Sequence, residues 1–456
     1  MLKRLMATLM AVILVVAVLA GCGAKKTTNS NVTKITMWSA DSHSKLVMEK
    51  LVNEFNRTIG KENDIEFEYI IKENDLSKQI EIALSTGQAP DFFGIDLDKG
   101  VQNDYIVSIE DMPGGKEFIA KYDGKLQNTY HTYNGKAYRV PMSVTTMGLV
   151  YNKDMFKKAG IVDENGEALP PETIDEMVEY AKKLTNNAKR EYGIVFPLKW
   201  SAWFGYEVSR SVMACNGYAS YNPVSGKFEY EGYKPFLDAI MQMKNDGSIY
   251  PGAEGLDNDP ARARFAEGNI GMKISYSWDV GVFNDQFPAK CDWGVAPIPT
   301  YSKTEKYLQP TQPSWSPCIN KKSADEKDKE KLMLVYKWLV SDDVARELYI
   351  RGVQIPYDYS IIEGVELDDN TKKGWKEFGE LLKISTDLIQ APKTNTDGKA
   401  SISSNFINKV WVGEMTVDEA IKDANQVSND GLKKYLDLHP DYDASIYMIP
   451  DYDVKR

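Results

Sequence analysis

The feature that most constrains this chain is a regular alternation of strand-like and helix-like segments near its N-terminal end. Residues 34–39, 64–70 and 90–96 are short and apolar, and the middle segment alternates apolar with acidic residues, as β-strands do. Between them, residues 44–60 place apolar side chains three and four positions apart, and residues 75–87 form a shorter helix closed by a glycine. Strands that alternate with helices pair in parallel through crossover connections. The sequence therefore predicts an α/β unit here.

A second alternation begins with residues 139–153, an extended apolar segment that runs directly into a helix. Thr173 and Glu176 offer a capping box for a helix that ends at residue 184. A strand, a helix–glycine–strand unit and a strand ending in prolines are predicted, in that order, at residues 191–198, 259–275 and 291–300. Residues 314–320 then lead into a long amphipathic helix. The chain from about residue 361 onward is predicted to be mainly helical.

The N-terminus has the character of a targeting segment. Lys3 and Arg4 precede an apolar run that is short for a membrane span and ends in small residues before Cys22. This stretch resembles a bacterial lipoprotein signal, which implies that residues 1–21 are removed and that Cys22 becomes the lipid-modified, palmitoylated first residue. An uncleaved anchor is the alternative. Residues 22–33 are small and polar, which suits a flexible tether.

Size and charge narrow the classes of protein and partner. About 430 residues remain after the signal, too many for one compact core and consistent with two lobes. The formal charge of −11 becomes about −13 without Lys3 and Arg4. That acidity disfavours nucleic acid and anionic lipid as partners and favours neutral or cationic ligands.

Cysteine usage gives no disulfide framework. Apart from Cys22 the chain has Cys215, Cys291 and Cys318, so one bridge at most is possible. We expect three buried thiols.

Motifs of several kinds of catalysis are missing from the sequence. No Gly-Lys pair is followed by Ser or Thr as in a P-loop, and the HExxH and GxSxG motifs do not occur. The three histidines are widely separated in sequence, which disfavours a zinc site or a histidine base. A pair of carboxylates stays open, so a surface glycosidase remains an alternative. We expect a protein that is not an enzyme and holds no metal or cofactor.

The aromatic residues indicate a ligand class. Several of the nine tryptophans fall where a predicted strand gives way to a loop, and ligands of α/β sheets bind beyond the carboxyl ends of strands. A flat ring packs against the apolar face of a sugar, while neighbouring carboxylates and hydroxyls bind its hydroxyl groups. The alternative for each tryptophan is core packing. As a group they favour a carbohydrate site.

Six segments together resemble the extracellular solute-binding proteins of bacterial ABC importers, family 1, the group that includes maltose- and oligosaccharide-binding proteins. They are "GQAPDFF" (87–93), "GKAYRVPMSVTTMGLVYNKDMFKKAG" (135–160), "FAEGNIGMKISYSWDVG" (265–281), "WGVAPIPT" (293–300), "GVQIP" (352–356) and "VWVGEMTVDEAI" (410–421). The resemblance covers nearly the whole chain after the signal. It implies a type II periplasmic-binding-protein-like fold, in which each of two lobes is a mixed sheet flanked by helices and a hinge joins them.

The resemblance also implies the division of the chain. Lobe 1 is expected from residues 34–142 and about 301–360, lobe 2 from residues 143–300, and C-terminal helices that pack on the lobes from residues 361–456. The extended segment noted above would cross from lobe 1 into lobe 2, with the return crossing near residues 300–315. The expected hinge residues are Pro141, Ser143, Thr145 and Thr146.

The family's mechanism implies that both lobes contribute to the site, close around a sugar, and deliver it to a membrane permease. The ligand-binding residues predicted on this basis are Trp38, Asp41, Asp96 and Trp315 in lobe 1, and Trp200, Trp203, Trp278 and Asp279 in lobe 2. Tyr276 stands where the family's "GxW"-type loop has glycine. Asp41 and Asp96 have an alternative role as helix caps.

The resemblance implies a monomer on the outer face of the membrane. A lipid anchor is typical of a cell without an outer membrane, which indicates a Gram-positive bacterium. The alternatives within the same fold are a polyamine or a peptide as ligand. A surface glycosidase would break its ligand down, and a surface adhesin would bind polymer without closing.

Overall fold

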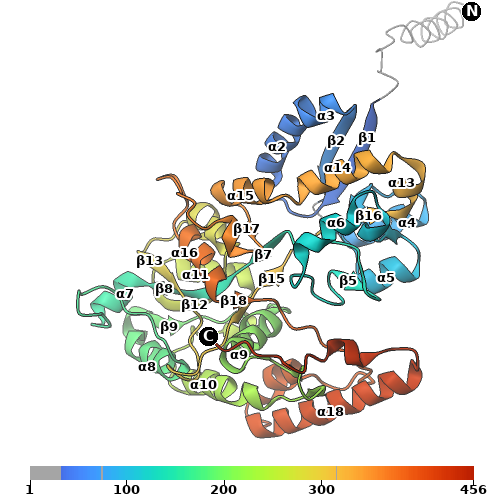
Figure 1. The fold of residues 1–456 in the computed structure, drawn as a ribbon. Helices are drawn as coiled ribbons and strands as arrows, with labels where there is room; N and C mark the ends of the chain where they lie inside the picture. The colour runs from blue at the N-terminus through green and yellow to red at the C-terminus, as the bar shows by residue number, and fades with distance from the viewer. Residues whose placement is uncertain (1–31, 73–74, 315) are drawn as a thin grey trace, which may run out of the picture.

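The computed structural model describes residues 32–72, 75–314 and 316–456. The predicted signal 1–21, the lipid attachment residue Cys22 and the binding candidate Trp315 lie outside these residues. Figure 1 shows two α/β lobes, with the N-terminal strands in the upper lobe and most of the middle of the chain in the lower one. The predicted two-lobe α/β fold is confirmed.

Lobe 1 is built on a five-stranded sheet in the order β2-β1-β3-β16-β4. The strands are β1 (Thr33–Ser39), β2 (Ile65–Ile71), β3 (Phe92–Phe93), β4 (Ile106–Val107) and β16 (Cys318–Asn320). β1 pairs in parallel with β2 and β3, as the alternation predicts. β16 pairs antiparallel with both β3 and β4, so a strand from a much later part of the chain completes the sheet.

Helices bury both faces of this sheet. The adjacent Phe92 and Phe93 point to opposite faces and belong to separate core clusters. The covering helices are α2 (Lys45–Arg57), α3 (Ile59–Glu62), α4 (Leu76–Ser85), α5 (Leu97–Gln102), α6 (Gly115–Ile119), α13 (Lys321–Glu326), α14 (Lys329–Leu339) and α15 (Asp342–Ile350). The long helix predicted after residue 320 is therefore two helices, because the Asp328 carboxylate caps α14 by accepting from the backbone N–H groups of Glu330 and Lys331.

Lobe 2 contains a four-stranded mixed sheet in the order β13-β8-β12-β9. The strands are β8 (Met147–Asn152), β9 (Tyr192–Ile194), β12 (Ile270–Tyr276) and β13 (Trp293–Ala296). β8 and β12 are buried along their whole length, as expected for strands with helices on both faces. Helix α11 (Asn258–Ala266) turns into β12 through Gly268 at φ +86°, which confirms the predicted helix–glycine–strand unit.

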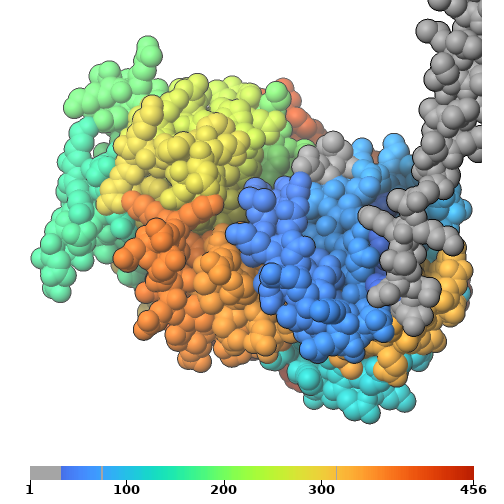
Figure 2. Space-filling view, turned by 90° about the horizontal axis from the view of Figure 1, so that it is seen from above, coloured from blue at the N-terminus to red at the C-terminus, as the bar shows by residue number. Residues whose placement is uncertain are grey.

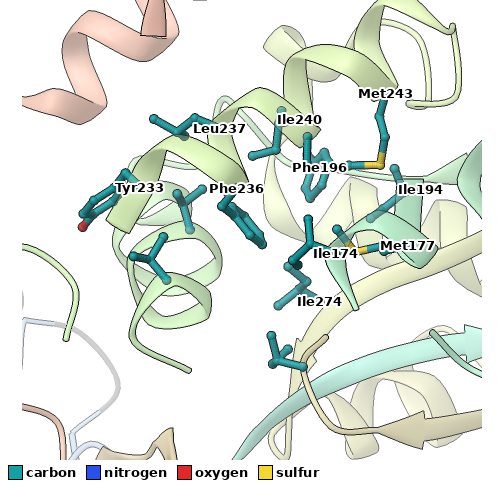
Figure 3. Close-up of a cluster of buried hydrophobic side chains, with 14 of the residues drawn as sticks. Ile174, Met177, Ile194, Phe196, Tyr233, Phe236, Leu237, Ile240, Met243 and Ile274 are labelled. Carbon is teal, nitrogen blue, oxygen red and sulfur yellow. The ribbon is translucent and has the colours of Figure 1, made fainter. Parts of the chain in front are cut away.

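Two helices form much of the lobe 2 core. α8 (Ile174–Leu184) begins with the predicted capping box, and α10 (Lys234–Asn245) lies beside it. Figure 3 shows their apolar side chains meeting those of the sheet, with Phe196 in the middle of the cluster. The smaller helices of this lobe are α7 (Lys153–Lys158), α9 (Arg210–Asn216) and α12 (Asp279–Gly281).

A small sheet of three strands lies where the chain passes between the lobes. Its order is β15-β7-β17, with β15 (Gln312–Pro313) and β17 (Ile355–Pro356) both antiparallel to β7 (Ser143–Thr145). β7 leads into β8, β15 leads back toward β16, and β17 leads out again to α16 (Trp375–Glu380), whose Trp375 and Phe378 pack with lobe 2 strands. The chain therefore crosses between the lobes three times, one crossing more than the sequence predicts.

The C-terminal part of the chain packs mainly on lobe 2. Strand β18 (Ser385–Thr386) pairs in parallel with β14 (Gln309–Pro310), and α17 (Ile402–Asn405) precedes the long α18 (Val417–Leu438), which packs on α10. An extended stretch without helix occupies residues 387–400, so this part is less helical than predicted. The exact lobe limits proposed from the sequence stay predictions.

Three cysteines lie among the described residues. The cysteines among them are free thiols; Cys215 and Cys318 are buried as expected, whereas Cys291 is partly exposed, which corrects the expectation of three buried thiols. Within residues 32–72, 75–314 and 316–456, no helix combines the length and the apolar character needed to cross a bilayer.

Candidate functional site

A cleft of about 1120 Å³ lies between the two lobes and is lined by three parts of the chain. Lobe 1 contributes the loop after β1 and the start of α4, lobe 2 contributes residues 277, 278, 280 and 281 after β12, and the crossing segments contribute residues 142–145 and 352–355. Seen from above in Figure 2, lobe 1 (blue) and lobe 2 (yellow to green) meet, with the orange segment beside their junction. The cleft thus lies beyond the carboxyl ends of β1 and β12, where α/β proteins bind ligands.

Trp38, predicted to bind ligand, lines the lobe 1 side of the cleft. It is the next-to-last residue of β1 and is partly exposed, and the Lys72 ammonium lies 4.3 Å from the centroid of its ring. A cation near an indole face is attracted by the ring and restricts its movement. The Trp38 ring therefore has restricted movement and presents an aromatic surface on the cleft wall.

Asp41, also predicted, lines the cleft and links it to the third crossing. One carboxylate oxygen accepts from the backbone N–H of Ser44 at 3.3 Å, next to the start of α2, and the other accepts from Gln354 Nε2 at 2.5 Å. The remaining carboxamide oxygen, Gln354 Oε1, is buried and has no hydrogen-bond partner among the described residues. A buried acceptor without a partner is rare, and a hydroxyl group of a bound ligand would satisfy it. Asp41 therefore lies on the cleft wall, where its ligand-binding role stays a prediction. It is not the N-cap of α2, which is Ser44, although its carboxylate accepts from the backbone N–H of that residue.

Tyr69, near the end of β2, supplies a polar group that the sequence did not single out. Burial raises the pKa of its phenol to about 12, and the nearby Asp41 carboxylate acts in the same direction. The phenol is therefore neutral at physiological pH and is available as a hydrogen-bond donor and acceptor.

Trp278, predicted from lobe 2, lines the cleft on an aromatic support. Its ring stacks on Tyr276 with centroids 4.6 Å apart and planes 26° apart, and it lies 5.6 Å from the ring of Tyr206. Tyr276 in turn donates its hydroxyl to the backbone carbonyl of Tyr206 at 2.6 Å. The tyrosine that replaces the family's glycine therefore forms the backing of this platform.

Asp279 does not reach the cleft, which corrects its predicted role as a ligand-binding residue. It is buried, its Oδ2 accepts from the backbone N–H of Tyr276 at 3.2 Å, and its Oδ1 lies 2.5 Å from Arg262 Nη2. Its carboxylate is thus used to fix the loop that carries Trp278.

Trp203 is also corrected, because its side chain is 0% exposed within the lobe 2 core. Its indole N–H donates to Glu207 Oε2 at 3.0 Å, and Glu207 Oε1 lies 2.8 Å from Lys273 Nζ. Burial raises the pKa of the Glu207 carboxyl, while the Lys273 ammonium acts against this rise. The group is a buried polar network behind the platform.

The two other described candidates lie outside the cleft wall. Trp200 packs its ring 5.4 Å from that of Tyr206 and is partly exposed, so it extends the aromatic group away from the cleft. Asp96 is an exposed residue at the N-terminal end of α5, which is the capping position considered as its alternative, although its side chain makes no capping hydrogen bond.

Some cleft residues were missed by sequence reasoning. Besides Tyr69 and Gln354 they include Trp375, whose ring lines the cleft while its indole N–H donates to the carbonyl of Tyr349 at 2.9 Å. Gln354 falls inside the segment 352–356 on which the family resemblance partly rests, and that position could have indicated it. Trp375 lies in a stretch without strand alternation, so its placement depends on the third crossing.

The charges on the cleft wall are mixed. Three carboxylates and two ammonium groups line it, together with the exposed His43, and they are Asp41, Asp75, Glu81, Lys78 and Lys372. Such a wall has no strong excess of either sign, although the whole chain is acidic. In the ranges that the structure describes, no three His, Cys, Asp or Glu residues are grouped so that they could hold a metal ion. The mixed charges of the cleft wall therefore favour a neutral polar ligand.

Comparison with known proteins agrees with this geometry. The family described as bacterial extracellular solute-binding protein matches residues 40–346, more than half of the chain. The maltodextrin-binding protein MdxE of Bacillus subtilis is 25% identical over 323 residues, which are 67% of this chain and 70% of that protein. The multiple sugar-binding protein of Streptococcus mutans is 22% identical over 284 residues, 59% of this chain and 64% of that protein.

Solved structures share the fold. The sugar-binding protein MalE of Xanthomonas citri superposes with a TM-score of 0.67 at 18% identity, covering 90% of this chain and 100% of that one. The cyclic α-maltosyl-1,6-maltose-binding protein of Arthrobacter globiformis gives 0.64 at 17% identity, covering 88% and 100%. Two lobes, a cleft between them and the family match lead to one conclusion: the chain belongs to the bacterial extracellular solute-binding proteins, the substrate-binding components of ABC importers.

Proposed function

We propose that the protein captures a carbohydrate, an oligosaccharide in particular, in the cleft between its lobes and delivers it to the permease of an ABC importer. The observation that carries this proposal is the Trp278 platform, stacked on Tyr276 and facing the same cleft as Trp38. Aromatic faces on two lobes, with carboxylate, carboxamide and hydroxyl groups between them, suit a ligand with apolar ring faces and a rim of hydroxyls.

The size of the cleft supports an oligosaccharide over a single sugar. At about 1120 Å³ it exceeds the roughly 300–1000 Å³ typical of small-molecule pockets. The names of the relatives point the same way, since they include a maltodextrin-binding protein and a melibiose/raffinose/stachyose-binding protein.

Lobe closure is the second part of the proposal. Contacts from both lobes make closure depend on ligand, because a ligand shifts the equilibrium only by its difference in affinity for the two states. The three-stranded crossing sheet supports bending at the predicted hinge residues Pro141, Ser143, Thr145 and Thr146. Thr146 is buried and donates its hydroxyl to the carbonyl of Phe378 at 2.7 Å, so we propose that bending occurs on the N-terminal side of this residue.

The anchoring is proposed from the sequence. The signal-like segment and Cys22 support a lipid-anchored protein on the outer face of a Gram-positive membrane, acting as a monomer without enzymatic activity. Mass spectrometry of the membrane-extracted protein tests this, because lipidation predicts a mature N-terminus at Cys22 that carries acyl chains.

The ligand is tested with protein that begins at about residue 25. We expect one class of oligosaccharide to raise the melting temperature saturably, to change the tryptophan fluorescence and to be recovered intact. The same protein with Trp278→Ala is the control, and its affinity is expected to fall about tenfold or more. If only polyamines or peptides stabilise the protein, the carbohydrate ligand is wrong and the ligand belongs to one of those classes. If the sugar is broken down, the protein is a glycosidase and not a binding protein.

A further inference from the structure

Arg210 is a buried cation that has no acidic partner among the residues that the structure describes. Its side chain is 6% exposed, at the first position of α9. The neighbouring cations Lys273 and Arg262 lie 2.8 Å and 2.5 Å from carboxylates, whereas Arg210 forms no ion pair within residues 32–72, 75–314 and 316–456. Buried charges are normally paired, so this exception calls for a physical reason.

Aromatic faces and neutral oxygens take the place of the acid. The Arg210 guanidinium carbon lies 3.9 Å from the ring centroid of Tyr206 and 5.7 Å from that of Tyr276. Nη1 lies 3.5 Å from the Tyr276 hydroxyl oxygen, and Nη2 donates to the carboxamide oxygen of Gln312. A planar guanidinium stacks on an aromatic ring while its edge donates hydrogen bonds, which an ammonium group does less well.

These partners belong to two functional elements. Tyr206 and Tyr276 are the rings that back Trp278, the lobe 2 aromatic residue of the cleft. Gln312 is in β15, the returning crossing strand, and is paired with Thr145 of β7, which also lines the cleft. Arg210 therefore touches both the aromatic platform and the crossing sheet.

We infer that Arg210 is a positioning residue that couples the Trp278 platform to the hinge sheet through Gln312. A ligand that moves the Trp278 ring also moves the rings of Tyr276 and Tyr206 behind it. The Arg210 guanidinium, which contacts both of these rings, passes the movement to β15 through Gln312. The bond to a neutral carboxamide is weaker than an ion pair and so permits the sheet to bend. This inference rests on the proposed function for its ligand, but not for the coupling itself.

The first test needs no ligand. Hydrogen exchange is measured on the full chain in mild detergent for wild type, Arg210→Met and Arg264→Met. Arg264 is the matched control, because it is on the same lobe, contacts the Tyr250 ring at 5.7 Å and is exposed. We expect Arg210→Met to speed exchange at both residues 143–146 and residues 276–279, while Arg264→Met leaves both unchanged. Unchanged exchange at either segment in Arg210→Met overturns the coupling.

The second test uses the oligosaccharide identified for wild type. Arg210→Met and Gln312→Leu are each expected to weaken binding at least about tenfold, with a double variant little worse than either alone. Arg210→Lys is expected to recover the stability that Arg210→Met loses, but not the affinity for the oligosaccharide. An ammonium group cannot stack on the Tyr206 ring and donate to Gln312 at the same time. Additive losses, or an unchanged Kd in Arg210→Met, overturn the inference while the proposed function stands. If wild type binds no sugar, the proposed function fails and the exchange experiment alone decides the coupling.

Discussion

At the scale of single residues, lobe 2 uses buried charges to hold aromatic side chains in place. Glu207 joins the indole of Trp203 to Lys273, and Asp279 joins the Trp278 loop to Arg262. Such charges are costly to bury, and each of these two carboxylates lies beside a cation and accepts a further hydrogen bond, from the Trp203 indole N–H or the Tyr276 backbone N–H. Glu207 and Asp279 therefore bind other parts of lobe 2 and do not line the cleft.

Removal of the Glu207 charge should be strongly destabilising. Glu207→Gln leaves the Lys273 ammonium buried without a carboxylate, so we expect the free energy of unfolding to fall by about 3–5 kcal/mol. Urea unfolding measures this. The matched control is Glu267→Gln, which breaks an exposed pair with Arg264 and should cost less than about 1 kcal/mol. Equal losses in the two variants would contradict the role of the buried pair.

His131 should give the protein a sensitivity to acid. It is 2% exposed, its Nδ1 accepts from the backbone N–H of Gln127 at 3.0 Å, and burial, with a smaller effect of Arg139, lowers its pKa to about 3. Below the unfolded value of about 6.5 the unfolded chain binds a proton that the folded protein does not, so stability falls as pH falls between these values.

The expected size of this effect is about 2 kcal/mol between about pH 7 and about pH 5. His131→Gln should lose that much less stability over the same interval, as measured by urea unfolding at the two pH values. His43→Gln is the control, because it removes a histidine that is exposed at the cleft. Equal pH dependence in wild type and His131→Gln would contradict the prediction.

At the scale of elements, the loop after β12 determines how Trp278 is presented. Asp279 and Asp259 both pair with Arg262, but the side chain of Asp279 is 2% exposed and that of Asp259 is 59% exposed. We expect Asp279→Asn to release the loop, weaken sugar binding about tenfold and reduce the near-ultraviolet circular dichroism of the tryptophans.

Asp259→Asn provides the matched comparison for this loop. It removes an exposed carboxylate from the same arginine, so binding and circular dichroism should stay close to wild type. If both variants lose binding equally, the Arg262 charge as a whole, and not the buried contact to Asp279, controls the loop.

Elements with strong periodicity could be predicted from the sequence, and short ones could not. The three parallel strands of lobe 1, the capped helix Ile174–Leu184 and the unit ending in β12 are found as expected. β17 is a two-residue strand that includes a proline, and its pairing with β7 is decided by tertiary contacts. Local patterns carry no signal for such a strand, and the third crossing was missed with it.

The candidate site was predictable where a side chain follows a strong strand. Trp38 and Trp278 come at the ends of β1 and β12 and line the cleft. Trp203 lies after a strand candidate as well, yet the local turn places its ring in the core, which residue order alone does not reveal. Trp375 reaches the cleft only because the third crossing brings it there.

At the scale of the whole molecule, closure should depend on aromatic groups from both lobes. Small-angle X-ray scattering should show a smaller radius of gyration when the saturating oligosaccharide is added to wild type. Trp38→Ala and Trp278→Ala should each weaken binding about tenfold or more and require correspondingly more sugar for the same compaction. Trp411 is buried in the C-terminal part of the chain and does not line the cleft. Trp411→Ala should therefore leave the sugar dependence of compaction unchanged. Binding without compaction would contradict lobe closure.

The position of β16 in the lobe 1 sheet also bears on the order in which the lobes can fold during synthesis. This strand lies between β3 and β4, and Cys318 pairs with Phe93 across a very long stretch of sequence. Until residues 318–320 have been synthesised, the sheet lacks its connecting strand and lobe 1 has no complete core. Contacts between such distant segments form slowly and late. Lobe 1 therefore completes its sheet only after residues 318–320 have been synthesised, although three of its strands belong to the first hundred residues.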